Sequence, residues 1–96
     1  MSTPESKVKA RCVDIIKKHK AYYFFPAQNG YGRAGVPDII VCYKGKFIGI
    51  ECKAGKGKLT ALQEYNIEQI KRNQGLAIVI NEGNIETLLT LVKEIE

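Results

Sequence analysis

With 96 residues, the chain is long enough for one domain and too short for two, so we expect a single domain over residues 1–96. Its composition (45% apolar, 26% charged) is that of a globular protein, its net charge of +5 favours a polyanionic partner, and no apolar run approaches the roughly 20 residues of a membrane-spanning helix. The first residues lack the apolar core of a signal peptide. The three cysteines have no CxxC spacing and the chain has a single histidine, which argues against disulfides and against a zinc site. We therefore expect a cytoplasmic, intracellular protein with three reduced core cysteines, Cys12, Cys42 and Cys52.

The hydrophobic pattern predicts seven secondary-structure elements. Apolar residues at helical spacing indicate a first helix that begins near Ser2 or Thr3. Its inward face consists of Val8, Cys12, Ile15 and Ile16. Three strands, a helix, a strand and a helix follow, over residues 22–25, 38–43, 47–53, 60–73, 76–80 and from the expected cap Asn84 onward. The order αβββαβα predicts a mixed α/β domain, with a central sheet flanked by helices.

Capping residues mark where two of the helices begin. Ser2 and Glu5 have the spacing of a capping box, as do Thr60 and Gln63, and Gly75 is the expected stop of the second helix. Glu5 also falls on the inward face of the first helix, where a carboxylate needs a partner. Two interpretations of Glu5 stay open: it caps the helix, or it belongs to a site.

Strand parity brings three ionisable residues together. Glu51 and Lys53 are two positions apart on one strand, so their side chains point to the same face. In a hairpin with a two-residue loop, the numbers of paired residues sum to an odd number, so Asp38 pairs with an odd-numbered residue of the returning strand. A four-residue loop gives the same result, whereas a three-residue loop would break the parity unless a bulge restored it. Asp38, Glu51 and Lys53 should therefore converge on one side of the sheet.

A metal site explains this convergence better than an ion-pair cluster at the rim of the sheet. Isolated charges are costly beside the apolar residues that flank them, and a buried ion pair seldom improves on apolar packing. Two carboxylates are suitable ligands for a hard divalent cation. We expect Asp38 and Glu51 to be those ligands, with Lys53 beside them.

These motifs resemble a known group of nucleases. Pro37-Asp38, a twelve-residue spacer and Glu51-Cys52-Lys53 are similar to the PD-(D/E)xK nuclease superfamily. Together with Glu5 in the first helix, Gly35-Val36 before Pro37, and Gln63 opening the next helix, they resemble its VRR-NUC family over nearly the whole chain. The resemblance implies a restriction-endonuclease-like fold and hydrolysis of phosphodiester bonds with Mg²⁺ or Mn²⁺.

The resemblance also implies roles for the site residues. The backbone carbonyl of Cys52 is expected as a further metal ligand beside the two carboxylates. Lys53 would orient or deprotonate the attacking water, or stabilise developing charge. Glu5 would hold a metal-bound water or a second ion, and Gln63 would position Lys53 or the water while also capping its helix.

The charge distribution indicates a nucleic-acid partner. Residues 1–58 contain twelve lysines and arginines and four acids, whereas residues 59–96 contain three and six. Arg33, Lys56 and Lys58 lie in glycine-rich loops near the expected site, where phosphate contacts or plain solvation are both possible. The other basic residues of the first half, Lys7, Lys9, Arg11, Lys17, Lys18 and Lys20, mostly form the outer face of the first helix.

We predict a metal-dependent endodeoxyribonuclease that recognises DNA structure. Small stand-alone members of the resembled family, of viral or bacterial type, act as homodimeric Holliday-junction resolvases, and two symmetric cuts favour a C2 dimer. The aromatic segment 22–25 is expected in the core or in the dimer interface. The alternatives are a non-catalytic basic DNA-binding module on the same fold, and a flap or nicking nuclease without junction preference.

Overall fold

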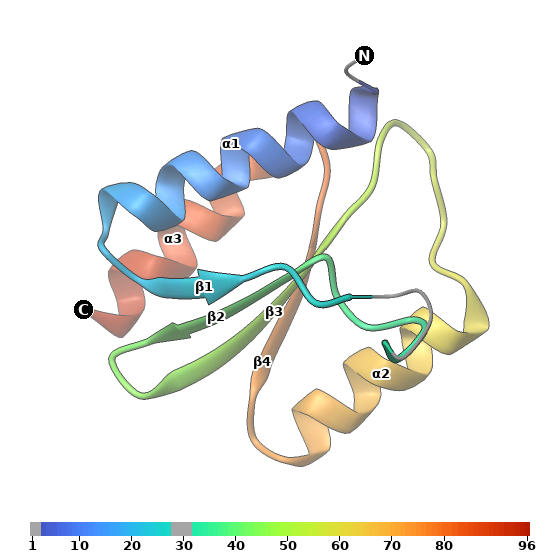
Figure 1. The fold of residues 1–96 in the computed structure, drawn as a ribbon. Coiled ribbons are helices and arrows are strands. Elements are labelled where there is room, and N and C mark those ends of the chain that lie inside the picture. Colours follow the sequence, from blue (N-terminus) through green and yellow to red (C-terminus); the bar gives the residue numbers. More distant parts are fainter. Residues whose placement is uncertain (1–2, 28–31) are drawn as a thin grey trace.

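The computed structural model describes residues 3–27 and 32–96 (Figure 1). Ser2, one of the two expected starts of the first helix, lies outside the described residues. The elements follow the predicted order, with bounds α1 Pro4–Lys18, β1 Tyr22–Phe24, β2 Ile39–Tyr43, β3 Lys46–Cys52, α2 Ala61–Arg72, β4 Leu76–Ile80 and α3 Ile85–Ile95. Asp38 and Lys53, expected inside strands, each lie one residue beyond a strand end.

The four strands form one mixed sheet in the order β1-β2-β3-β4. β1 and β3 each run antiparallel to β2, whereas β3 and β4 are parallel and are connected through α2. The β2–β3 turn consists of Lys44 and Gly45, both with positive φ, at 51° and 81°. Two positive φ angles are the signature of the tight hairpin turn that suits the twist of antiparallel strands.

Helices cover both faces of the sheet. α1 and α3 lie together over one face, and α2 packs on the other, near β4 (Figure 1). The core lies under α1 and α3 and consists of Val8, Cys12, Ile16, Ile39, Val41, Tyr43, Ile48, Ile50, Cys52, Ile80, Ile85, Leu88 and Val92. Among the described residues, no helix has both the length and the apolar character to cross a bilayer.

Cys42 corrects one sequence prediction. All three cysteines are free, and Cys12 and Cys52 are buried as expected, but Cys42 is exposed. Cys42 pairs with Phe47 on β3 and with Tyr22 on β1, so it points away from the α1–α3 core. Phe47 and Tyr22 are also exposed, so the second layer does not cover this end of the sheet.

Glycines hold the segment before Asp38 close to α2. Pro37 and Ile70 pack closely against Gly49 of β3. A Cβ atom added to Gly49 would lie 2.8 Å from Pro37 Cγ and 2.9 Å from Ile70 Cδ1. Gly35 has φ +78°, and its Cβ would lie 2.5 Å from Leu62 Cγ. A side chain at either position would push the chain away from α2 and displace Asp38.

The observed caps differ from two predictions. Thr3 is the N-cap of α1, and its capping box is completed by Ser6, so Glu5 is not part of the box. Asn84 stands at the N-cap of α3 but makes no capping hydrogen bond, because its side chain accepts from Asn81 N and donates to Val79 O. The Asn84 side chain therefore organises the turn that precedes α3.

The end of α2 depends on a strained residue. Gln74 has φ 66°, whereas Gly75, the predicted stop, follows it and donates to Ile70 O at 2.9 Å. This pattern is the Schellman motif, in which glycine is favoured at the position that Gln74 occupies. The glycine at 75 is needed for another reason, since a Cβ there would lie 2.8 Å from Ile70 Cγ2.

Replacing Gln74 with glycine should therefore stabilise the protein. We expect Gln74→Gly to raise the free energy of unfolding by about 0.5–1 kcal/mol, because glycine adopts positive φ without steric cost. Urea denaturation measures the change, with Gln74→Ala as the control that removes the side chain but keeps the Cβ atom. A lower stability for Gln74→Gly than for Gln74→Ala would contradict the role of φ.

Candidate active site

The β-hairpin sets Asp38 opposite Glu51. The ladder runs from Tyr43 paired with Lys46 to Ile39 paired with Ile50, and one further step places Asp38 beside Glu51. The two-residue turn thus fulfils the parity that the sequence predicted. Asp38 Oδ2 accepts a hydrogen bond of 2.7 Å from the backbone N–H of Cys52, which fixes this carboxylate at the end of the hairpin.

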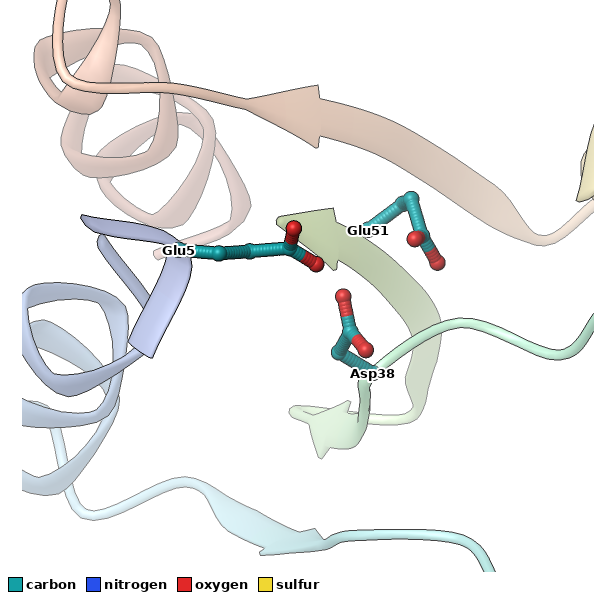
Figure 2. Close-up of side chains that lie close together, drawn as sticks. All are labelled: Glu5, Asp38 and Glu51. Atoms are coloured by element: carbon teal, nitrogen blue, oxygen red, sulfur yellow. The ribbon is translucent and has the colours of Figure 1, made fainter. Parts of the chain in front are cut away.

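Glu5 adds a third carboxylate to this pair. One oxygen from each of Glu5, Asp38 and Glu51 lies within 4.8 Å of the others. Figure 2 shows the three carboxylates directed toward a common space, from α1, from the segment before β2 and from β3. Because Thr3 and Ser6 already cap α1, the Glu5 carboxylate is not engaged as a cap. Glu5 is exposed and not buried on the inward face as predicted, and its role in a site stays a prediction.

Burial and like charge act together on Glu51. Glu51 is only 2% exposed, and its carboxylate lies close to the carboxylate of Asp38. Desolvation, followed by the charge of Asp38, raises the pKa of Glu51 from its ordinary value of 4.5 to about 8, while Lys53 opposes the shift. A cation between the carboxylates would favour the ionised form, so this electrostatic arrangement suits a cation site.

Lys53 and Gln63 both contact Glu51. Lys53 Nζ lies 3.9 Å from Glu51 Oε2, and Gln63 Nε2 donates to the same oxygen at 3.0 Å. Gln63 Oε1 also accepts from Thr60 N at 2.9 Å in the predicted capping box. The amide of Gln63 thus joins the start of α2 to Glu51, whereas the sequence analysis placed it near Lys53 or a water.

The capping and positioning roles of Gln63 can be separated. Thr60→Ala removes one hydrogen bond of the capping box, and Gln63→Ala removes the other one together with the hydrogen bond to Glu51. We expect each variant to lose about 1 kcal/mol of stability, and only Gln63→Ala to weaken Mn²⁺ binding, by about tenfold. Denaturation and isothermal titration calorimetry measure the two effects. Equal Mn²⁺ affinities in the two variants would show that Gln63 does not position Glu51.

The donor set fits a hard divalent cation. Three carboxylates converge, and one lysine at 3.9 Å does not balance their charge, which argues against a purely structural ion-pair cluster. The N–H and C=O groups of one strand residue point toward the same neighbouring strand. Since the N–H of Cys52 points to Asp38, its carbonyl is directed to the same side and can join the oxygen ligands that Mg²⁺ or Mn²⁺ prefers.

A depression of about 450 Å³ lies beside the carboxylates and is bordered by Glu5, Asp38, Cys52 and Lys9. Lys9 was predicted on the outer face of its helix, but it lies one turn after Glu5 and therefore on the same side. Its Nζ atom also stacks over the Phe25 ring, 4.2 Å from the centroid. The four-residue spacing from Glu5 was the signal that could have assigned Lys9 to the site.

The predicted phosphate-binding residues divide into two groups. Lys56 and Lys58 are exposed in the loop that follows Lys53, and their contact with phosphate stays a prediction. Arg33 is also exposed, but it lines a different depression, beside α2. The amides that share this second depression, Asn66, Gln69 and Asn73, were not singled out from the sequence. Their spacing of three and four residues, which places them on one helix face, could have revealed them.

Comparison of the chain with models of protein families gave no match, and comparison with curated proteins gave none either.

Proposed function

We propose that this protein is a divalent-metal-dependent endodeoxyribonuclease. The observation that carries the proposal is the convergence of Glu5, Asp38 and Glu51 at one end of a hairpin, with Lys53 beside them. A binding module that only needed to attract phosphate would gain affinity by losing these acids, because carboxylates repel it. Their retention in the basic half of the chain supports hydrolysis over binding alone.

We further propose a restriction-endonuclease-like topology and a place near the VRR-NUC family. The element order and the mixed sheet β1-β2-β3-β4 support this assignment, as does the position of the motif Glu51-Cys52-Lys53 at the end of the central strand β3. The acid of the first helix, Glu5, lies where the proposed site needs it. The N-terminus of α2 also approaches the site, through Gln63.

Each residue of the site has a proposed role. Asp38, Glu51 and the Cys52 carbonyl would hold Mg²⁺ or Mn²⁺, a cation that when bound polarises a phosphoryl oxygen and activates water. The hydrogen bond from Gln63 holds Glu51 in place. The Lys53 ammonium is positioned to orient the attacking water or to stabilise negative charge that develops on the phosphate.

A homodimer acting on branched DNA is the proposed assembly. Two cuts related by symmetry need two copies of a single-site domain, and a C2 dimer supplies them. The three-residue edge strand β1 supports such an assembly, since Tyr22 and Phe24 on it and Phe25 after it are 69%, 47% and 50% exposed. Exposed aromatic residues on a sheet edge favour contact with another chain.

Cleavage of a labelled four-way junction and of matching linear duplex, in Mg²⁺, Mn²⁺ and EDTA, tests the proposal. Paired symmetric cuts in the junction alone, present only with metal, are the expected result. Cleavage of both substrates would keep the nuclease and reject the junction preference, in favour of a flap or nicking enzyme. Tight DNA binding without cleavage in either metal would reject the enzyme in favour of a binding module.

A further inference from the structure

We propose that the depression between α2 and β3 binds an unpaired nucleobase of the DNA strand. This inference rests on the proposed function, because it supplies a second contact for the same nucleic acid. The depression has a volume of about 390 Å³, within the range of small-ligand sites. Its wall contains an aromatic ring, a set of side-chain amides and a guanidinium, in Phe47, Asn66, Gln69, Asn73 and Arg33.

Phe47 provides a surface for base stacking. Its side chain is 45% exposed although it lies on β3 beside the buried residues Ile48 and Gly49. Gly75 lies against the edge of its ring, since a Cβ atom there would be 3.3 Å from Phe47 Cδ1. A ring that is held at its edge and open to solvent can stack on a base, and stacking tolerates every base because each has a π-face.

The amides of α2 supply hydrogen-bonding groups for a base edge. Asn66 is only 5% exposed, and its Nδ2 donates to Leu62 O at 2.9 Å, which holds the side chain rigidly. Asn73 Nδ2 donates to the backbone oxygen of Gln69 at 2.8 Å. Within residues 3–27 and 32–96, no hydrogen bond engages the Gln69 side chain, whose amide can both donate and accept. Glutamine pairs with adenine through these two groups.

The position of the depression relative to the carboxylates suits a single DNA strand. Phe47 and Glu51 are four residues apart on β3, so both side chains point to the α2 face, about 13 Å apart along the strand. Stacked nucleotides advance about 3.4 Å each, so a base in the depression would lie about four nucleotides from the phosphate at Glu51. Arg33, which lines the depression, would contact a phosphate of the same strand.

The mixture of apolar and polar groups in the lining favours a base over a second copy of the chain. The centre of an interface between copies is depleted in polar groups and rich in apolar ones. Here three amides and Arg33 share the depression with the apolar residues Phe47, Ile70 and Gly75, whereas the edge at β1 carries exposed aromatic residues outside the depression. A planar heterocycle with polar edges matches this mixture of one ring and several amides.

Binding of fluorescein-labelled single-stranded oligonucleotides in EDTA tests the inference without cleavage. Fluorescence anisotropy should show an affinity about tenfold lower for Phe47→Ala, and also for Phe47→Leu, which keeps the packing but loses the stacking surface. Tyr65→Ala is the matched control, because Tyr65 is a similarly exposed aromatic residue of α2 (53%) that does not line the depression. Gln69→Ala should reduce the preference for adenine over thymine oligonucleotides.

The outcomes separate this inference from the proposed nuclease. If both Phe47 variants lose affinity for the oligonucleotides and the unchanged protein cleaves no substrate, the base site is kept and the enzyme is rejected. Metal-dependent cleavage with oligonucleotide affinity unchanged in both Phe47 variants would keep the enzyme and overturn the base site. Sedimentation that shows a dimer converted to monomer by Phe47→Leu would also overturn it, because the surface would then be an interface between copies.

Discussion

Asp38→Asn should abolish metal-dependent cleavage, with a rate at least about 10³-fold below that of the unchanged protein. The substitution keeps an oxygen that can accept from Cys52 N–H, so the end of the hairpin should remain in place. It removes one of the three converging charges, and with it a ligand for the cation. Loss of about 4 kcal/mol of transition-state stabilisation corresponds to this factor.

The control for Asp38→Asn is Asp14→Asn. Asp14 is an exposed acid of α1, nine residues or about 13 Å along the helix from Glu5, so the same chemical change there should leave cleavage unaltered. Single-turnover cleavage rates at saturating Mn²⁺ compare the two variants. A rate for Asp38→Asn within tenfold of that for Asp14→Asn, at equal folded fractions, would mean that the carboxylate cluster does not act in hydrolysis.

Strand parity made the centre of this site predictable from the sequence. The face to which Asp38, Glu51 and Lys53 point depends on one local feature, the length of the turn between two strands. Lys44-Gly45 is recognisable as a tight turn. The period of two then fixes the face for every residue of the hairpin. Local rules were sufficient because the site is built from neighbouring strands.

Residues that reach the site from other elements were harder to place. Glu5 had two open interpretations, a helix cap or a site residue, and the position of the helix start decides whether it can cap: with Thr3 as the N-cap, Ser6 completes the box. The contact of Gln63 with Glu51 depends on how α2 docks on the sheet, which no periodicity encodes. The exposure of Cys42 likewise reflects how far α2 extends over the sheet, not the pattern within its strand.

Glu51→Gln should change the pH dependence of stability. The pKa of Glu51 is raised to about 8, against an ordinary 4.5, so the folded state binds this proton more tightly than the unfolded chain. The stabilising contribution of the protonated group is fully present below about pH 4.5 and is lost as the pH rises through 8. Relative to Glu51→Gln, the unchanged protein should therefore lose on the order of 3 kcal/mol between pH 5 and 9.

Urea denaturation across this pH range, in EDTA, measures the difference in free energy of unfolding between the unchanged protein and Glu51→Gln. The control is Glu68→Gln, at an exposed acid of α2, for which the same difference should not change with pH. Adding Mg²⁺ should reduce the loss of stability at high pH in the unchanged protein, because a cation binds the ionised carboxylate and displaces its proton. Glu51→Gln should respond to Mg²⁺ much less. If instead both difference curves are flat in EDTA, Glu51 ionises without cost, and the like charge of Asp38 and Glu5 does not prepare this site for a cation.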